Sequence, residues 1–268
     1  MRLGGSIAIN ALTLGATGRQ LWTPSQISTL AWYDASDTSP TNIVESSGDV
    51  SQWSDKSGNG YHLQQSTGSL QPRTGDTTQN GLNVLDGDGS VAMTATGASI
   101  PADQDFHIYI VQNRGTGDNL WELKGTVPTA LRALDNSIAQ GRQRGGAAFP
   151  ATPDGTIGAF NLYYSNCLNS VIGSSNELNR YENGSITTVA SSTTDPSVAA
   201  FQSGDIFSEI WAFDDSTGGN SLVGSFAEII YTTSSSNREL IEGYLAHRWG
   251  IANLLAVGHP YRDTPPYV

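Results

Sequence analysis

Only one segment of this chain has the spacing of an amphipathic helix, and it lies near the C-terminus. Residues 226–232 form a short aromatic and β-branched run that predicts a strand, and a serine cluster follows it. Apolar residues then recur three and four positions apart, at Leu240, Ile241, Tyr244, Leu245 and Trp249. Gly250 stands where a glycine commonly ends a helix. A chain of 268 residues with a single late helix must build its core from β-strands.

Polar residues mark the start and the outer face of this helix. Ser236 and Glu239 have the spacing of a capping box, in which each side chain binds a free backbone amide. Glu242 and His247 fall with Glu239 on the polar half of the circumference. Arg248 falls inside the apolar arc. Either its stem carries the charge out to water, or the guanidinium forms a partly buried ion pair with a carboxylate of the early Asp-rich loops. Both alternatives are structural.

Short strand-like runs separated by turn residues recur at roughly 8–12-residue intervals through the rest of the chain. Residues 106–112 are mostly apolar and predict a strand buried on both faces. Asn183-Gly184 predicts a hairpin, because these residues suit the two positive φ angles of a type I′ turn. The pattern predicts an all-β sandwich of two antiparallel sheets with one C-terminal helix. We expect residues 21–268 to form this one domain.

Composition excludes several classes of partner. The chain has 13 Lys and Arg against 25 Asp and Glu, and a formal net charge of −12. Phosphates repel such a chain, and no apolar run approaches the ~20 residues that span a bilayer. We therefore expect no nucleic acid partner and no membrane insertion. Cys167 is the single cysteine, which rules out an intrachain disulfide and predicts a small buried side chain. The N-terminus makes a poor signal peptide.

Residues 1–20 predict an N-terminal arm outside the domain. Its apolar residues are spaced two or three apart among small and polar ones. That spacing suits an extended segment that docks onto a partner, or else a terminus that folds back or stays disordered. The candidate docking residues are Arg2, Leu3, Ile7, Ile9, Leu12 and Leu14.

The middle of the chain supplies a candidate rim for a ligand. Residues 124–160 are the most basic and loop-like stretch, and they form either a solvated loop or a rim that meets an acidic partner or a glycan. Five tryptophans lie in apolar patterns and are expected in the core: Trp22, Trp32, Trp53, Trp211 and Trp249. The candidate residues of a glycan or protein rim are Trp121, Arg132, Arg142 and Arg144.

Several stretches, taken in order, resemble one known group of domains. They are Trp32-Tyr33-Asp34-Ala35-Ser36-Asp37, Trp53-Ser54-Asp55-Lys56-Ser57-Gly58-Asn59-Gly60, Asn80-Gly81-Leu82-Asn83-Val84-Leu85-Asp86-Gly87, Tyr181-Glu182-Asn183-Gly184, Ala227-Glu228-Ile229-Ile230, Glu242-Gly243-Tyr244-Leu245-Ala246-His247-Arg248-Trp249-Gly250 and His259-Pro260-Tyr261. The set resembles concanavalin A-like jelly rolls, specifically the laminin-G-like domains of bacteriophage tail and virion proteins and of large bacterial surface proteins. The resemblance implies two curved antiparallel sheets that bind glycans or proteins at loop rims, in some members with calcium.

The wider fold includes glycosidases, whose chemistry needs two carboxylates flanking the scissile bond. In the related glucanases these alternate along one strand of the concave face. The comparable strand here offers Glu209, Trp211 and Phe213, so the alternate positions are aromatic. Asp214 and Asp215 are adjacent and would point in different directions. The sequence therefore predicts no catalytic residue and no enzyme.

Metal sites are weakly indicated. The run from Asp86 to Ser90 has the composition of a calcium loop, but no glutamate occupies the twelfth position, so a turn is the simpler interpretation. The four histidines lack zinc-ligand spacing. We predict no cofactor and no metal ligand, with calcium left open.

The resemblance and the missing catalytic pattern together predict a non-enzymatic structural or interaction protein of a phage particle, as a capsid decoration or tail component. The arm would dock to other virion proteins, and the jelly roll would face outward in a homo-oligomer, guessed as a trimer. The virion is the expected location, and the extracellular space or cell surface is the alternative. Two other functions stay open: a glycan-binding module for host-surface recognition, and a polysaccharide hydrolase.

Overall fold

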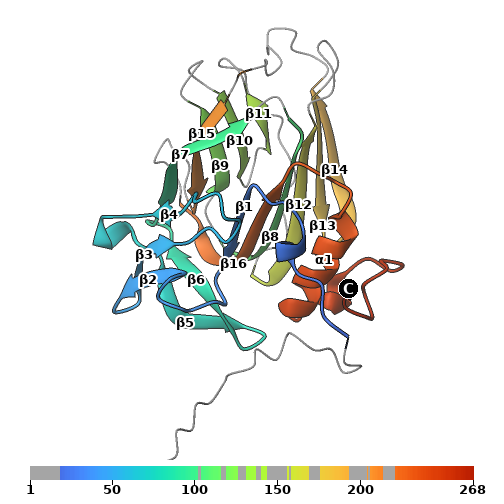
Figure 1. The fold of residues 1–268 in the computed structure, drawn as a ribbon, viewed down its shortest axis with the longest axis horizontal. Helices are drawn as coiled ribbons and strands as arrows, with labels where there is room; N and C mark the ends of the chain where they lie inside the picture. Colours follow the sequence, from blue (N-terminus) through green and yellow to red (C-terminus); the bar gives the residue numbers. More distant parts are fainter. Residues whose placement is uncertain are drawn as a thin grey trace, which may run out of the picture.

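The computed structural model describes residues 19–101, 104–115, 119–125, 131–136, 140–143, 156, 158–168, 176–192, 204, 206–213 and 221–268. Within them, strands dominate and one α-helix lies near the C-terminus (Figure 1). The elements are η1 (Pro24–Gln26), β1 (Ala31–Asp34), β2 (Ile43–Ser46), β3 (Asp49–Trp53), β4 (Leu63–Gln64), η2 (Gly68–Leu70), β5 (Arg73–Gln79), β6 (Leu82–Asp88), β7 (Met93–Pro101), β8 (Phe106–Arg114), β9 (Asn119–Gly125), β10 (Leu131–Asn136), β11 (Gln140–Gln143), β12 (Phe160–Leu168), β13 (Asn176–Glu182), β14 (Ser185–Ser192), β15 (Ile206–Ala212), β16 (Val223–Thr232), α1 (Arg238–Arg248) and η3 (Ala252–Leu254).

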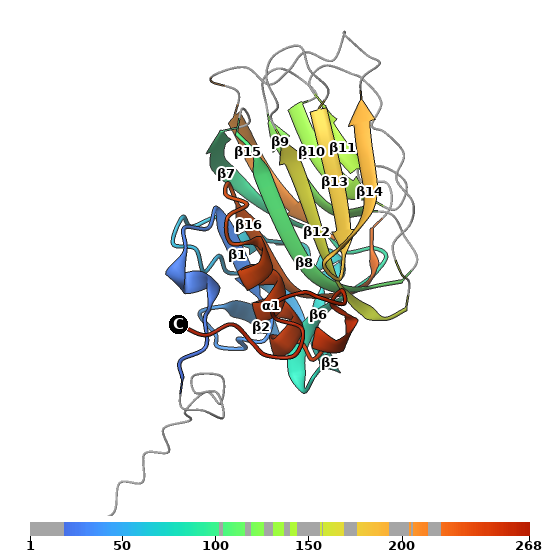
Figure 2. The same cartoon turned by 90° about the vertical axis from the view of Figure 1, so that its right-hand side faces the viewer.

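The strands pair antiparallel along one path, β11-β10-β9-β15-β7-β4-β3-β5-β6-β16-β8-β12-β13-β14, and β1 adds to β16 and β2 to β3. This path folds into two layers. One layer holds β7, β15, β9, β10 and β11, and the other holds β16, β8, β12, β13 and β14, with α1 against its outer side (Figures 1 and 2). The prediction of an all-β antiparallel sandwich with one C-terminal helix is confirmed.

The space between the two layers is filled by large apolar side chains. Phe106 of β8 and Phe207 of β15 come from opposite layers, and their rings meet edge to face with centroids 5.4 Å apart. Trp53 and Tyr33 lie in the same core and are fully buried. Each such side chain stabilises the fold by about 1.5–3 kcal/mol through the apolar area it removes from water.

A second core lies between the outer side of the β8–β16 layer and α1. Tyr109 and Val111 of β8 contribute to it, together with Leu245 of the helix and Trp249 directly after it. Because β8 contributes side chains to both cores, its residues are buried on both faces, as its apolar run predicts. Trp249 is fully buried here.

A β-bulge in β16 divides its residues between the two cores. The register with β8 shifts between Phe226 and Glu228. As a result Ala227 faces the helix-side core, and Ile229 returns to the core between the layers. Glu228 also comes to lie beneath the helix, where its carboxylate contacts the Tyr244 hydroxyl.

The sequence prediction is wrong for the start of α1 and correct for its end. The predicted capping box is wrong: the helix begins at Arg238 after Asn237, and the Ser236 hydroxyl bonds to that of Ser234 at 2.7 Å. Gly250 is confirmed as the residue that ends the helix. It has φ +70°, its amide donates to His247 O, and the next amide donates to the carbonyl of Ala246, which is a Schellman motif.

The C-terminal tail packs back onto the helix. The His259 imidazole lies 3.1 Å from the Glu242 carboxylate, and the Arg238 guanidinium contacts the same carboxylate at 3.4 Å. The placement of Glu242 on a solvated face is therefore wrong, because the tail covers it. The tail ends beside the start of the domain, where the Val268 amide donates to Gln20 O.

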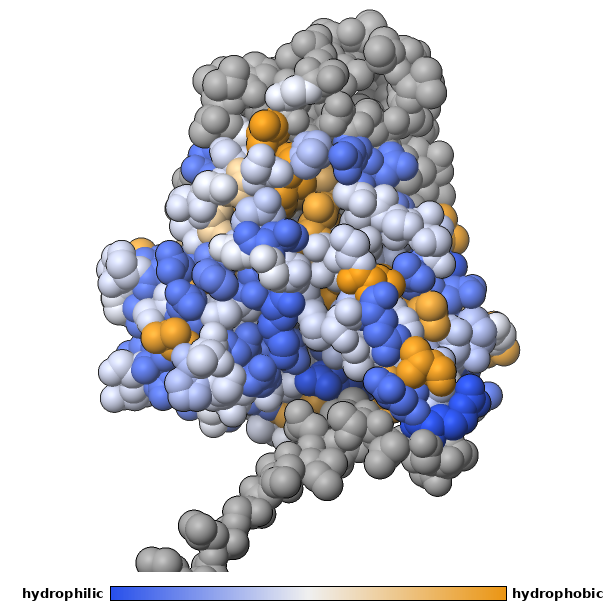
Figure 3. Space-filling view, in the orientation of Figure 1, coloured by the Kyte–Doolittle hydropathy of each residue, from blue (hydrophilic) through white to orange (hydrophobic). Residues whose placement is uncertain are grey.

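Other local predictions can also be compared with the structure. Asn183 and Gly184 have φ +51° and +78° and join β13 to β14, which confirms the hairpin. The loop expected over residues 124–160 is wrong in part, because β10 and β11 lie within it. In the described residues no helix is long and apolar enough to cross a bilayer. Figure 3 shows a mostly hydrophilic described surface with small separate apolar groups.

Candidate functional site

The outer face of the layer that contains β15 carries a partly exposed tryptophan. Trp211 was expected in the core, but it is only partly buried. The reason is a register shift against β7 between Phe207 and Glu209. After the shift Ile210 and Ala212 face the core, so Glu209 and Trp211 face outward. The core prediction is wrong for Trp211, while the other four tryptophans named with it are buried.

A glutamate and a lysine hold this indole in place. The Trp211 Nε1 donates to Glu209 Oε2 at 3.1 Å, and Lys124 Nζ of β9 lies 3.8 Å from the same oxygen. Glu209 and Lys124 keep 23% and 37% of their side chains exposed, so the pair adds little stability. Its consequence is positional: the indole edge is fixed, and the local charges offset each other.

Uncharged polar side chains continue the same face across neighbouring strands. Gln52, Gln64, Thr94 and Trp211 pair one with the next in register across β3, β4, β7 and β15. The Gln64 amide nitrogen donates to the Gln52 side-chain oxygen at 2.8 Å. Adjacent strands lie about 4.8 Å apart, so the row spans about 14 Å. The two glutamine amides lie at one end of the row and the Trp211 ring at the other, while the Thr94 hydroxyl between them is buried.

A second glutamate lies next to this row in the backbone register. Glu122 of β9 pairs with Trp211, and Lys124 pairs with Glu209, so Glu122 and Glu209 are diagonal neighbours across two strands. Diagonal residues of adjacent antiparallel strands are about 7–8 Å apart. Alternation along a single strand gives no sign of two glutamates that are neighbours only in the register between strands.

The predicted rim residues lie on the strands that extend this layer. Trp121 belongs to β9, Arg132 to β10 and Arg142 to β11, and Arg132 pairs in register with Lys124. Arg144 lies outside the described residues, as do the side chains of the other three. The rim therefore stays a prediction, with the added finding that its strands adjoin the face of Trp211.

The predicted docking arm falls outside the described residues, which begin at residue 19. Its six residues, which stay a prediction, are Arg2, Leu3, Ile7, Ile9, Leu12 and Leu14. The side chain of Cys167 also lies outside the described part.

In the described residues, no group of three or more His, Cys, Asp or Glu side chains could hold a metal ion. Asp88 instead accepts hydrogen bonds from the amide and hydroxyl of Ser90, at 2.9 and 2.6 Å, and Asp86 accepts one from the Ser225 hydroxyl at 2.6 Å. These bonds make a local turn. Calcium binding stays untested.

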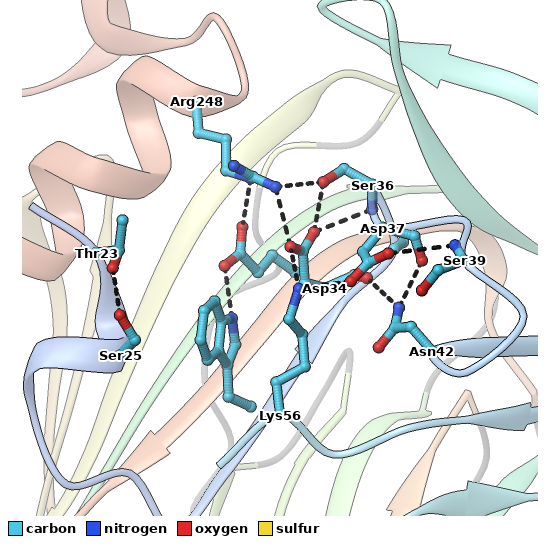
Figure 4. Close-up of polar contacts among 12 residues, drawn as sticks. Thr23, Ser25, Asp34, Ser36, Asp37, Ser39, Asn42, Lys56 and Arg248 are labelled. Atoms are coloured by element: carbon cyan, nitrogen blue, oxygen red, sulfur yellow. Dashed lines mark hydrogen bonds and ion pairs between the residues drawn. The ribbon is translucent and has the colours of Figure 1, made fainter. Parts of the chain in front are cut away.

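A separate polar cluster ties α1 to the sheet (Figure 4). Arg248 Nη2 lies 2.9 Å from Asp34 Oδ2 and also contacts the Ser36 hydroxyl, and its Nε lies 3.5 Å from Glu228 Oε2. Of the two alternatives for Arg248, the partly buried ion pair with an early aspartate is confirmed. Burial alone would lower the pKa of Arg248, but Glu228, Tyr244 and Asp34 outweigh it and raise that pKa.

Glu228 is the most buried acid of this cluster. Its carboxylate accepts hydrogen bonds from Trp32 Nε1 at 2.7 Å, Trp249 Nε1 at 2.8 Å and the Tyr244 hydroxyl at 3.1 Å. Burial raises the pKa of Glu228 to about 7, with a further rise from Asp34, against the lowering effects of Arg248 and the two indoles. No solvent reaches this side chain, so its role is structural.

No model of a known protein family matches the chain, and no curated protein sequence matches it. Solved structures do match. An arabinofuranosidase complexed with arabinofuranosyl-α-1,2-xylobiose aligns with TM-score 0.51 and 13% identity, over 72% of this chain and 50% of that one. Trypanosoma rangeli sialidase aligns with TM-score 0.51 and 10% identity, over 86% and 34%. Its complex with 2,3-difluoro-KDN aligns with TM-score 0.50 and 9% identity, over 90% and 36%.

These likenesses show a shared β-sandwich fold, and the chain spans about half of the arabinofuranosidase and about a third of the sialidase. They correct the function expected from the sequence. The prediction of a non-enzymatic structural protein of a phage particle is wrong, because the fold is shared with an arabinofuranosidase and a sialidase, enzymes that act on sugars. The prediction that the chain is not an enzyme is wrong on the same finding.

Proposed function

We propose that the chain recognises carbohydrate on the outer face that carries Trp211. The observation that supports this most is the outward turn of an indole on a sheet face whose neighbouring side chains include two amides and one charge pair. An aromatic ring packs against the C–H groups of a sugar, and the surrounding polar groups exchange hydrogen bonds with its hydroxyls.

The composition of the face favours a glycan over other partners. Glu209 and Lys124 offset each other, so the described part of the face attracts neither a strong anion nor a strong cation. The overall charge of −12 opposes nucleic acid. The row from Gln52 to Trp211 is too polar for an apolar peptide, and its estimated length of about 14 Å suits an extended chain. The fold shared with sugar-acting enzymes supports the same choice.

The test is a glycan array that includes arabinoxylan fragments and sialosides, followed by calorimetry on each hit. Trp211→Ala should weaken binding at least about tenfold, which is about 1.4 kcal/mol. Ile186→Ala, at an exposed apolar side chain of β14 in the other layer, is the matched control and should bind as the unchanged protein does. An array without hits, or full affinity in the Trp211 variant, would contradict the proposal.

A second candidate function is glycoside hydrolysis on the same face. The observation that favours it is the diagonal register of Glu122 and Glu209, which places two glutamates of adjacent strands with their backbones about 7–8 Å apart, and glycoside hydrolysis uses two carboxyl groups. Glu209→Gln should lower the rate of release from an aryl arabinofuranoside or sialoside at least about 100-fold, while Glu45→Gln at an exposed site of β2 should not. No measurable release by the unchanged protein would reject hydrolysis and leave binding in place.

A further inference from the structure

A polar hollow of about 310 Å³ lies where the loop after β1 meets the end of α1. Figure 4 shows charged and hydroxyl side chains from both parts turned toward one another. Several parts of the chain contribute to the wall, which includes Asp34, Asp37, Thr38, Lys56, Leu82 and Arg248. The hollow therefore exists only in the folded chain. It belongs to the layer covered by α1, opposite the layer that carries Trp211.

Its charges are held in fixed positions. Lys56 Nζ lies 3.0 Å from Asp37 Oδ2 and 3.2 Å from Asp34 Oδ2. Burial alone would raise the pKa of Asp37, but hydrogen bonds from Ser39 and Lys56 lower it. Burial would likewise lower the pKa of Lys56, and the two carboxylates raise it instead. Both side chains therefore stay charged through the neutral range.

Hydrogen-bonding capacity remains on the open side of these groups. An ammonium has three N–H donors, and the two aspartates use two of them on Lys56. Asp37 keeps 36% of its side chain exposed and Lys56 keeps 25%. A carboxylate oxygen accepts more than one bond, so Asp37 has acceptor sites left for a ligand. Leu82 adds an apolar contact to the same hollow.

A group that both donates and accepts suits this arrangement. A carboxylate or phosphate only accepts, and it would approach two aspartates. A metal ion would approach a lysine and an arginine, and the described residues hold no metal cluster. A hydroxyl group accepts from Lys56 and donates to Asp37 at once. A ligand with two neighbouring hydroxyls can form a second such pair of hydrogen bonds beside the first, while its carbon skeleton faces Leu82.

We infer that the hollow is a second ligand site, and that it binds a vicinal pair of hydroxyl groups of one sugar residue or small polyol. The site is separate from the outer face of the opposite layer, and it does not depend on the function proposed for that face. An affinity in the millimolar range, with Kd ~1 mM, fits one sugar held by a few hydrogen bonds.

The experiment is an NMR titration of backbone amides with methyl α-mannopyranoside, which has vicinal hydroxyls, and with its 3-deoxy analogue, whose remaining hydroxyls are not on adjacent carbons, and inorganic phosphate as comparison probes. Methyl mannoside should shift the amides of residues 36–39 and 56. The deoxy analogue and phosphate should bind at least about tenfold more weakly. Asp37→Asn should weaken mannoside binding about tenfold, because it removes a charged acceptor but keeps the shape.

The matched control is Asp76→Asn, at an exposed aspartate paired with Arg73, which should leave the titration unchanged. Thermal unfolding of both variants checks that the fold is kept. If Asp37→Asn unfolds the protein, Thr38→Val replaces it as the probe of the same wall. Absence of shifts with the mannoside, stronger binding of phosphate, or equal affinity in the Asp37 and Asp76 variants would overturn the inference.

Discussion

Glu228 should make the protein less stable as the pH rises through the neutral range. Its pKa is about 7 in the fold, against 4.5 for an ordinary glutamate. Between these values the folded state keeps a proton that the unfolded state has released, so its stabilising effect is complete below about pH 4.5 and is lost as the pH rises through about 7. At about 1.4 kcal/mol for each pKa unit, the loss is about 3 kcal/mol.

Urea unfolding at a series of pH values measures this effect. Between about pH 5 and about pH 8 the unchanged protein should lose roughly 2–3 kcal/mol relative to Glu228→Gln, whose side chain stays neutral while its oxygen still accepts hydrogen bonds. Asp37 has a lowered pKa, so its effect on stability has the opposite dependence on pH. Its contribution to stability is lost only as the pH falls into the acid range. Parallel stability curves for the two proteins would refute the role of Glu228.

Two substitutions test the packing that surrounds the helix and the hairpin. In Gly243→Ala the new Cβ would collide with the side chain of Tyr261. The free energy of unfolding, measured with a chemical denaturant, should fall by about 1–3 kcal/mol, and protease should cut the tail more readily. An unchanged cleavage pattern would speak against that contact. Asn183→Ala loses a residue that favours positive φ and the hydrogen bond that the Leu162 amide donates to its side-chain oxygen, so the unfolding free energy should fall by about 1–2 kcal/mol. An unaltered melting curve would contradict this.

Local backbone geometry was the most predictable part of the fold. Gly250 and the pair Asn183-Gly184 adopt positive φ angles, which residue type alone favours. The two-sided burial of β8 was also visible, because an unbroken apolar run leaves no solvent face. The ion-pair alternative for Arg248 followed from its place in the apolar arc, although the sequence named only a group of loops as its partner.

The bulges account for the main failures. A one-residue shift in pairing sends every later side chain to the opposite face, and it is set by the neighbouring strand. For this reason the alternation in β15 gave no sign that Trp211 would face outward. The start of α1 was predicted wrongly for another reason: the helix begins after Asn237, which makes no side-chain capping bond, and the Ser236 hydroxyl bonds to Ser234 instead. Glu242 is buried by a tail whose return path no local pattern encodes.

The most direct test of carbohydrate binding at Trp211 is the indole spectrum of the protein during a glycan titration. Each of the six tryptophans gives one Nε1–H signal, and Trp211→Phe assigns the signal of Trp211 by its loss. With a ligand found on the array, we expect the Trp211 signal to move and those of the buried Trp53 and Trp249 to stay in place. A saturating ligand that leaves the Trp211 signal in place would contradict binding on this face.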